Sequence, residues 1–289
     1  MEKIIIVGAG PAGISAALYA ARGNVQPLVI NNGIGSLEKA EKIENYYGLE
    51  QPLSGAALFA RGIAQARALG VRFVEAQMLG VRGYDPYEVV TTAGSFETQS
   101  IIFATGSRRA APPIEGLAGL EGHGVSYCAV CDAFFYRGKD VAVLGGGDYA
   151  LHEAQELAAV ANSVTIFTNG QEPTFAGQTV FEVKTEKVSA IVGTDGVVSG
   201  VLLEGQQTPV AVAGVFVALG TAGSADMARQ MGAALTDKGN IRVDAQMATN
   251  VPGVFAAGDC TGGLLQVAKA VHEGAQAGLS AVQYVRKKN

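Results

Sequence analysis

Residues 3–13 read KIIIVGAGPAG, an apolar run that leads directly into a glycine-rich turn. We expect a short buried strand over Lys3–Val7 and an alanine-rich helix over Ala12–Arg22, which ends before Gly23. A second strand is expected over Pro27–Ile30. This order of strand, turn, helix and strand is typical of α/β folds, so it sets the fold class.

The turn carries the spacing G-x-G-x-x-G through Gly8, Gly10 and Gly13, with Pro11 and Ala12 inside it. Glycine allows a tight bend, a close approach of the backbone to a pyrophosphate and tight packing of the helix on the strand. The N-terminus of the helix would face the anion. A plain tight turn could use the same glycines, but their place between strand and helix favours a dinucleotide cofactor.

Amides stand at the end of the second expected strand, where an acidic residue often holds the ribose of such a cofactor. The residues there are Asn31 and Asn32. An amide can still hydrogen-bond a hydroxyl, so Asn31 is a candidate cofactor ligand.

Composition narrows the class of protein. The chain has 289 residues, 48% hydrophobic and 16% charged, which is enough for two compact domains. A net charge of -5 argues against a nucleic-acid surface. No apolar run approaches the roughly 18 to 20 residues of a membrane span. With three cysteines a secreted disulfide framework is not expected, so we predict a cytoplasmic protein.

The alternation of strands and helices continues along the chain. Expected helices lie at residues 56–69, 149–161 and 266–284, and expected strands at residues 71–75, 88–92, 100–103, 140–144, 164–167, 180–192, 197–203, 215–219 and 254–257. A break at Pro112-Pro113 predicts a linker. A second glycine turn, Gly145–Gly147, joins a strand to a helix, so this unit looks like a repeat of the first.

A closely spaced cysteine pair, Cys128 and Cys131, lies just before the second glycine turn. Half of a zinc site would have the same spacing, but no second ligand pair is evident among Cys260 and the three isolated histidines His123, His152 and His272, so no metal is predicted. As a redox pair, the two thiols can close a short ring. If a helix begins here, its dipole lowers the thiol pKa and favours the reactive thiolate.

Asp132 and Cys260 have separate expected roles. Asp132 directly follows the second cysteine, where it could carry the proton that accompanies thiolate release. A helix cap is the alternative role for this residue. Cys260 stands alone after Gly258-Asp259 and is expected to be a small packed side chain.

Four segments in this order resemble the low-molecular-weight thioredoxin reductase family: Gly8–Gly13, Ala104-Thr105-Gly106, Cys128–Asp132 followed by Phe134-Phe135, and residues 249–259. The resemblance covers nearly the whole chain. It implies two Rossmann-like three-layer domains: an FAD domain from residues 1–110 and 220–289, and an inserted domain, residues 111–219, that carries the cysteine pair. It also implies a hinge of two short strands and a homodimer.

The same resemblance assigns roles to individual residues. The first glycine turn and Ala104-Thr105-Gly106 would hold FAD, Asn45 would lie near the flavin, and Gly258-Asp259 would bind the ribityl chain. Gln266 and the backbone of Val267 and Ala268 would face the isoalloxazine ring. Other readings remain open, namely a turn residue for Asn45, a strand-end cap for Asp259 and an exposed helix residue for Gln266. Cys131 would meet the flavin and Cys128 the substrate.

The second glycine turn departs from the family. Tyr149 and His152 replace a small hydroxyl residue and an acid, and residues 168–173 read TNGQEP where NADPH-dependent members carry arginines for the 2′-phosphate. No acid is present to prefer NADH. Residues 167–180 also leave no room for a full helix. We therefore expect a structural relic in place of a nicotinamide site.

A reductase frame that keeps the cysteine pair and loses the NADPH site resembles the ferredoxin-dependent flavin thioredoxin reductases. That resemblance implies electron flow from ferredoxin through FAD and the Cys128–Cys131 disulfide to thioredoxin. Three alternatives remain: an NADPH-dependent thioredoxin reductase, an oxygen-using dithiol oxidase and a non-enzymatic flavin redox sensor. A ferredoxin-type NADP reductase is disfavoured, because it needs the missing arginines and has no use for the cysteines.

Overall fold

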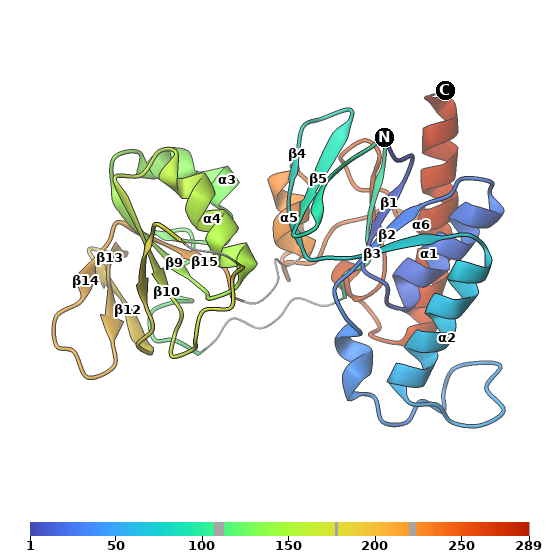
Figure 1. Ribbon diagram of the computed structural model, residues 1–289, viewed down its shortest axis with the longest axis horizontal. Coiled ribbons are helices and arrows are strands. Elements are labelled where there is room, and N and C mark those ends of the chain that lie inside the picture. The colour runs from blue at the N-terminus through green and yellow to red at the C-terminus, as the bar shows by residue number, and fades with distance from the viewer. Residues whose placement is uncertain (107–112, 177–178, 220–223, 289) are drawn as a thin grey trace. The chain divides into compact units, whose positions relative to one another are not determined.

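The computed structural model describes residues 1–106, 113–176, 179–219 and 224–288, without the side chains of Val130, Cys131 and Ser224. The chain divides into two compact units, each built on a sheet (Figure 1). Unit 1 comprises Met1–Arg109 with Gly223–Asn289, and unit 2 comprises Ala110–Ala222. The predicted linker at Pro112-Pro113 and the predicted hinge strands fall largely outside the described residues.

Unit 1 has a parallel five-stranded sheet in the order β16-β7-β1-β2-β3. Its strands are β1 (Ile5–Val7), β2 (Leu28–Asn31), β3 (Arg72–Glu75), β7 (Ile101–Phe103) and β16 (Val254–Ala256). An antiparallel sheet is formed by β4 (Met78–Arg82), β5 (Tyr87–Thr91) and β6 (Gly94–Thr98). The helices are α1 (Pro11–Arg22), η1 (Gly35–Lys39), α2 (Gly55–Ala68), α5 (Ser224–Gln230), η3 (Asp259–Thr261) and α6 (Val267–Lys287).

Unit 2 repeats the architecture with a parallel sheet in the order β11-β10-β9-β15-β8. Its strands are β8 (Val125–Ser126), β9 (Asp140–Leu144), β10 (Ser163–Phe167), β11 (Glu182–Lys184) and β15 (Gly214–Val217). An antiparallel sheet consists of β12 (Val188–Thr194), β13 (Val197–Leu203) and β14 (Val210–Ala211). The helices are α3 (Ala129–Asp132), η2 (Ala133–Tyr136) and α4 (Asp148–Ala158).

These elements confirm the predicted α/β class and most of the predicted strands and helices. Two boundaries were wrong: α4 ends at Ala158 and not Ala161, and residues 180–192 form two strands, β11 and β12, instead of a continuous stretch. The predicted lack of a full helix between β10 and β11 holds for the residues that the structure describes there. The sequence did not indicate β4, β6 or α5. These elements are short, and a segment of five to seven residues gives little periodicity to read.

Helices α1 and α6 pack side by side in unit 1, blue against red in Figure 1. Small residues make this possible. A β-carbon on Gly274 would lie 2.1 Å from the carbonyl oxygen of Ala12, and one on Gly278 would lie 2.5 Å from that of Ala16. Because both sites face main chain and not a flexible side chain, the helices can reach this distance only without the extra carbon.

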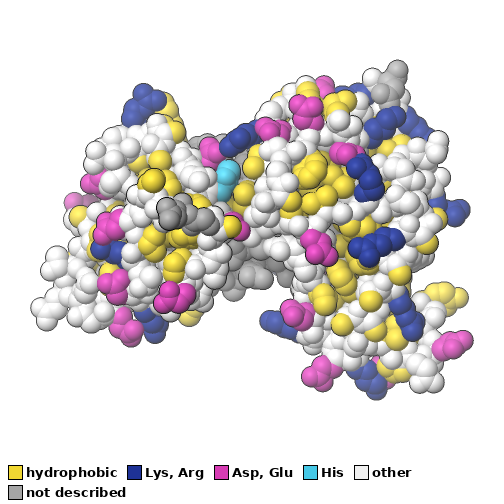
Figure 2. Space-filling view, in the orientation of Figure 1, with side chains coloured by type: hydrophobic (Ala, Val, Ile, Leu, Met, Phe, Trp, Pro, Cys, Tyr) yellow, Lys and Arg dark blue, Asp and Glu magenta, His cyan; other side chains and the backbone are white. Residues whose placement is uncertain are grey.

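On the face drawn in Figure 2, positive and negative side chains are interspersed on both units and do not gather into an area of one sign. No helix among the described residues is long and apolar enough to cross a membrane.

Replacing Gly278 by alanine should therefore destabilise the protein by about 1–3 kcal/mol, because α1 and α6 must move apart. The measurement is the urea midpoint of the flavin-loaded protein. His272→Ala, an exposed site on the same helix, is the control and should change the free energy of unfolding by no more than about 0.5 kcal/mol. Equal midpoints for the two variants would contradict the close-packing account.

Candidate functional site

The carboxyl ends of three neighbouring strands meet at one edge of the unit 1 sheet. Val7 in β1 is in register with Phe103 in β7, which is in register with Ala256 in β16. The residues that follow these strands, Gly8 and Ala104 among them, therefore lie together. In the sheet, β2 pairs with one side of β1 and β7 pairs with the other side, so the strand order reverses at β1. In open parallel sheets such a switch in strand order is where ligands bind.

Each glycine of the first turn has a distinct reason to lack a β-carbon. Gly8 has a φ of +104°, and a β-carbon there would lie 2.4 Å from the carbonyl oxygen of Ala104. A β-carbon on Gly13 would lie 1.9 Å from the carbonyl oxygen of Gly8. In contrast, Gly10 has no atom within 4 Å of that position. Two glycines thus hold the helix on the strands, and the third borders open space at the N-terminus of α1.

This open space fits the pyrophosphate of a dinucleotide. The first N–H groups of a helix have no acceptor within the helix, so those of Ala12 and Gly13 can serve an anion. Pro11 occupies the first helical position, where its missing N–H costs nothing.

Asn31 ends β2, next to the glycine turn, and supplies a second sign of a ligand. Its side-chain oxygen is buried and has no hydrogen-bond partner among the described residues. Buried acceptors are nearly always satisfied in native proteins, so this atom fits a donor such as a ribose hydroxyl.

The structure brings together Asn45 and Gln266, two candidates that are 221 positions apart. The Asn45 amide donates a hydrogen bond of 2.9 Å to the Gln266 side-chain oxygen. Gln266 is the N-cap residue of α6, which begins at Val267, and Gln266 and Ala268 are exposed. A bare turn role for Asn45 does not account for this contact. The pair forms a polar patch at the N-terminus of α6.

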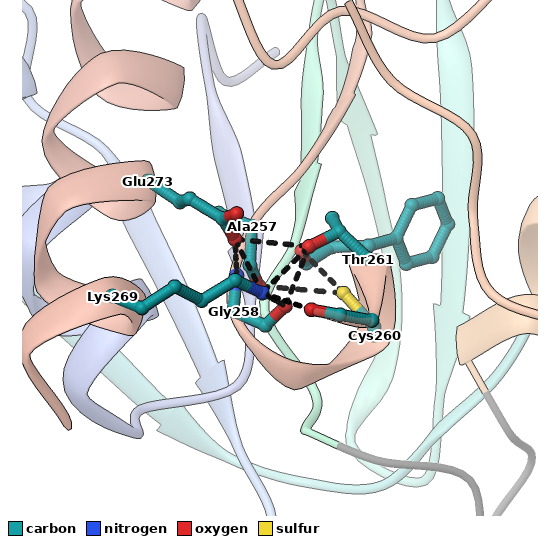
Figure 3. Close-up of polar contacts among 8 residues, drawn as sticks. Ala257, Gly258, Cys260, Thr261, Lys269 and Glu273 are labelled. Carbon is teal, nitrogen blue, oxygen red and sulfur yellow. Dashed lines mark hydrogen bonds and ion pairs between the residues drawn. The ribbon is translucent and has the colours of Figure 1, made fainter. Parts of the chain in front are cut away.

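A buried ion pair joins α6 to the turn after β16 (Figure 3). Lys269 lies 3.0 Å from the Glu273 carboxylate one helical turn later. Its Nζ donates to three oxygens, the carbonyls of Gly258 (2.7 Å) and Gly262 (2.5 Å) and the Thr261 hydroxyl (2.9 Å). Glu273 in turn accepts the N–H of Gly258 at 2.8 Å. The two side chains are only 15% and 13% exposed, so the pair fixes this turn.

Asp259 and Cys260 lie within the turn that the ion pair fixes. Burial raises the pKa of the Asp259 carboxyl, and the nearby Lys269 charge opposes part of the rise. Burial also raises the pKa of the Cys260 thiol to about 12, and this thiol donates to the Ala257 carbonyl at 3.3 Å. Cys260 is free and 3% exposed. The prediction that Cys260 is a small packed side chain is confirmed.

Unit 2 carries the cysteine motif at the start of α3. Cys128 is disulfide-bonded and has no exposed surface. The hydroxyl of Ser126 accepts the Cys128 N–H at 3.1 Å and donates to the Asp132 carboxylate at 2.6 Å. Asp132 stands at the N-cap position of η2 but makes no side-chain cap bond there, so the alternative of a helix cap is wrong. The side chain of Cys131 lies outside the described part.

Two exposed aromatic residues follow the cysteine motif. Phe134 and Phe135 are 70% and 68% exposed, and their rings stand edge to face with centroids 6.2 Å apart. The guanidinium of Arg137 lies 5.4 Å from the centre of the Phe134 ring. Exposed aromatic pairs of this kind are typical of protein-binding surfaces.

The second glycine turn starts like the first. A β-carbon on Gly145 would lie 2.1 Å from the Ala218 carbonyl oxygen, just as Gly8 faces Ala104. The difference lies at the third position of the turn, where Gly147 faces the hydroxyl of Thr174 at 3.7 Å while Gly10 faces open space. The predicted likeness of the two turns therefore holds for their backbones.

A loop covers the mouth of this second turn. The Thr174 N–H donates to the Gly146 carbonyl at 2.7 Å, and the Ala176 N–H donates to the Asp148 carboxylate at 2.8 Å. Asp148 is the first residue of α4. Residues 173–176 thus lie beside the N-terminal end of α4, where a pyrophosphate would bind.

The sequence analysis did not identify three members of these sites: Lys269, Glu273 and Ser126. The spacing of Lys269 and Glu273, four residues apart on a predicted helix, was a readable signal for an ion pair. Ser126 gave none, because its role depends on how β8 turns into α3. Among the described residues, no group of three or more His, Cys, Asp or Glu side chains is arranged to hold a metal ion.

Comparison with known proteins gives the class. The model of the pyridine nucleotide-disulphide oxidoreductase family matches residues 2–274. Thioredoxin reductase of Listeria monocytogenes is 34% identical over 302 residues, covering 98% of this chain and 94% of that protein. Thioredoxin reductase of Aquifex aeolicus is 38% identical over 275 residues, covering 89% and 84% of the two chains.

Two solved structures of thioredoxin reductases are also similar to this chain. The atypical thioredoxin reductase TRi from Desulfovibrio vulgaris Hildenborough has a TM-score of 0.94 and 37% identity, covering 100% of this chain and 99% of that one. A ferredoxin-flavin thioredoxin reductase from Clostridium acetobutylicum has a TM-score of 0.74 and 30% identity, covering 99% and 98%.

The chain belongs to the pyridine nucleotide-disulphide oxidoreductase family. It is a flavin-dependent disulfide oxidoreductase of the thioredoxin reductase type, and its cofactor is FAD. The open space at Gly10 fits the pyrophosphate of FAD, and the buried side-chain oxygen of Asn31 fits a ribose hydroxyl.

Replacing Lys269 by methionine should leave Glu273 buried without its cation, at a cost of about 3–5 kcal/mol, and should loosen the turn at Gly258. We expect a lower melting temperature and a lower ratio of bound FAD to protein after gel filtration. The exposed Lys287→Met is the control, and removal of both charges in K269M/E273M should recover part of the stability. Unchanged melting and FAD content in K269M would refute this role.

Proposed function

We propose that this protein is a thioredoxin-disulfide reductase fed by ferredoxin, with electrons passing through FAD and the Cys128–Cys131 disulfide. The observation that carries the reductase activity is the disulfide bond at Cys128, next to the exposed Phe134 and Phe135. The curated relatives and the solved neighbours, which are named as thioredoxin reductases, support the same substrate.

Unit 1 would hold the cofactor. In this proposal the turn of Gly8, Gly10, Pro11, Ala12 and Gly13 holds the pyrophosphate, through the N–H groups of Ala12 and Gly13, and Asn31 binds a ribose hydroxyl. Further contacts come from a set on the same edge of the sheet and on α6: Asn45, Ala104, Thr105, Gly106, Gly258, Asp259, Gln266, Val267 and Ala268. FAD, when bound, supplies a centre that accepts electrons singly or in pairs and releases a pair to a disulfide.

Unit 2 would carry the dithiol. Reduction breaks the bond between the two sulfurs with two electrons and two protons, and thiol exchange then passes both electrons to the thioredoxin disulfide. We assign Cys131 to the flavin side and Cys128 to the substrate side, as the family resemblance implies. We assign the accompanying proton to Asp132, which directly follows Cys131 and whose carboxylate accepts the Ser126 hydroxyl at 2.6 Å. Cys128 is fully buried, so the exchange requires movement that exposes α3.

The choice of donor rests on the covered second glycine turn. The loop at Thr174 and Ala176 already uses the carbonyl of Gly146 and the carboxylate of Asp148. A nucleotide would have to displace these contacts, and residues 168–173 contain no Lys or Arg for the 2′-phosphate of NADPH.

Cations near this turn are already paired with acids. Lys184 lies 2.7 Å from Glu182, and Lys187 lies 3.9 Å from Glu204. Asn169, at the end of β10, uses its side-chain oxygen to accept the Val188 N–H at 2.9 Å. These contacts support a donor other than a pyridine nucleotide, and the ferredoxin-flavin neighbour suggests which one. The homodimer and the cytoplasmic location stay predictions.

An anaerobic titration of the flavin-loaded protein tests the donor. Reduced ferredoxin should bleach the flavin absorbance, whereas NADPH and NADH at equal concentration should leave it yellow. Addition of oxidised thioredoxin should then restore the colour in the wild type but not in Cys128→Ser, because the variant lacks the exchanging sulfur.

Other outcomes identify the alternatives. Rapid bleaching by NADPH would establish an ordinary NADPH-dependent enzyme and overturn the role given to the covering loop. Recolouring by oxygen but not by thioredoxin would indicate a dithiol oxidase. Bleaching that neither acceptor reverses, with identical behaviour of Cys128→Ser, would indicate a redox sensor.

A further inference from the structure

Helix α4 follows the second glycine turn, yet its most buried polar side chains point toward the cysteine motif. Tyr149 and Glu153 are 3% and 1% exposed. They are four residues apart, so they lie on one face of the helix. Each makes a hydrogen bond to the backbone beside Cys128.

Together these two bonds hold the two peptide groups that flank Cys128. Glu153 Oε2 accepts the N–H of Ala129 at 2.7 Å, which belongs to the peptide that follows Cys128. The Tyr149 hydroxyl donates to the carbonyl of Tyr127 at 3.4 Å, which belongs to the peptide that precedes it. A displacement of either peptide group would break one of these bonds.

The position of Glu153 also has an electrostatic consequence. Ala129 is the first residue of α3, so the Glu153 carboxylate lies at the N-terminal end of this helix. The N–H groups at such an end favour a nearby thiolate. The N–H that Glu153 accepts from Ala129 favours its ionised form, and a negative charge at this place disfavours the thiolate. Destabilising the reduced form makes a disulfide harder to reduce, and its dithiol becomes a stronger reductant.

We propose that α4, no longer a nucleotide-binding helix, positions the redox disulfide: Tyr149 and Glu153 fix the peptides that flank Cys128, and the Glu153 charge lowers the reduction potential of the disulfide. The proposal rests on the proposed disulfide reductase activity. It gives a physical reason why strand β9, the glycine turn and α4 persist although the turn is covered. Tyr149 and Glu153 are positioning residues, because they act through hydrogen bonds to the backbone beside Cys128.

Glu153→Gln keeps the shape and one acceptor oxygen but removes the charge. The disulfide potential is measured in glutathione buffers with thiol labelling as the readout, so neither ferredoxin nor thioredoxin is needed. We expect the potential to become less negative. The equilibrium constant with glutathione should change about tenfold, which is 29.6 mV for a two-electron couple. The matched control is Glu156→Gln on the same helix, near His152, which should leave the potential close to that of the wild type.

Tyr149→Phe is the second variant and remains informative if Glu153→Gln does not fold. Because the Tyr149 hydroxyl is buried, its loss should lower kcat for thioredoxin reduction roughly threefold to tenfold and leave KM for thioredoxin unchanged.

An unshifted potential in Glu153→Gln, or an equal shift in Glu156→Gln, overturns the role of the charge. An unchanged kcat in Tyr149→Phe overturns the positioning role of the Tyr149 hydrogen bond. A wild type that reduces no thioredoxin, with the Glu153→Gln shift intact, refutes the proposed function and not this inference.

Discussion

The fit of helix α1 against the sheet edge is the constraint on which unit 1 depends. A β-carbon on Gly13 would lie 1.9 Å from the carbonyl oxygen of Gly8, and one on Gly8 would lie 2.4 Å from that of Ala104. Main chain cannot yield as a side chain can, so these positions must be glycine. The same close fit places the first N–H groups of α1 beside the open space at Gly10. Binding of the cofactor and packing of the core are therefore set by one arrangement of backbone.

Unit 2 uses the same arrangement for another purpose. Gly145 meets Ala218 as Gly8 meets Ala104, so the strand, turn and helix keep their geometry. The end of α4 is covered by the chain itself, through Thr174 and Ala176, and the side of α4 is bonded to the peptides around Cys128. In the proposed function this helix binds no nucleotide, and its bonds to the peptides around Cys128 give it an internal role. A scaffold can persist in this way while its ligand changes.

Much of this arrangement was predictable from the sequence. The glycine spacing predicted α1 and its turn, because only a few conformations accept those residues. The loss of the nicotinamide site, expected from the missing arginines, stays a prediction. Asn45 and Gln266 were expected at one cofactor from the family resemblance, and the structure brings their side chains into contact. The loop over the second turn and the bond from Glu153 to Ala129 were not predictable. Both depend on tertiary packing between segments about 20 to 30 positions apart, for which neither periodicity nor spacing gives a signal.

The central claim is that the flavin and the disulfide form one electron-transfer unit. Anaerobic titration with dithionite, followed at the flavin absorbance, tests it by counting electrons. The wild type should take up two electrons for the flavin and two more for the disulfide before the flavin is fully bleached, and Cys128→Ser should take up only the first two. Equal uptake by the two proteins would contradict the account, because it would mean that Cys128 exchanges no electrons with the flavin.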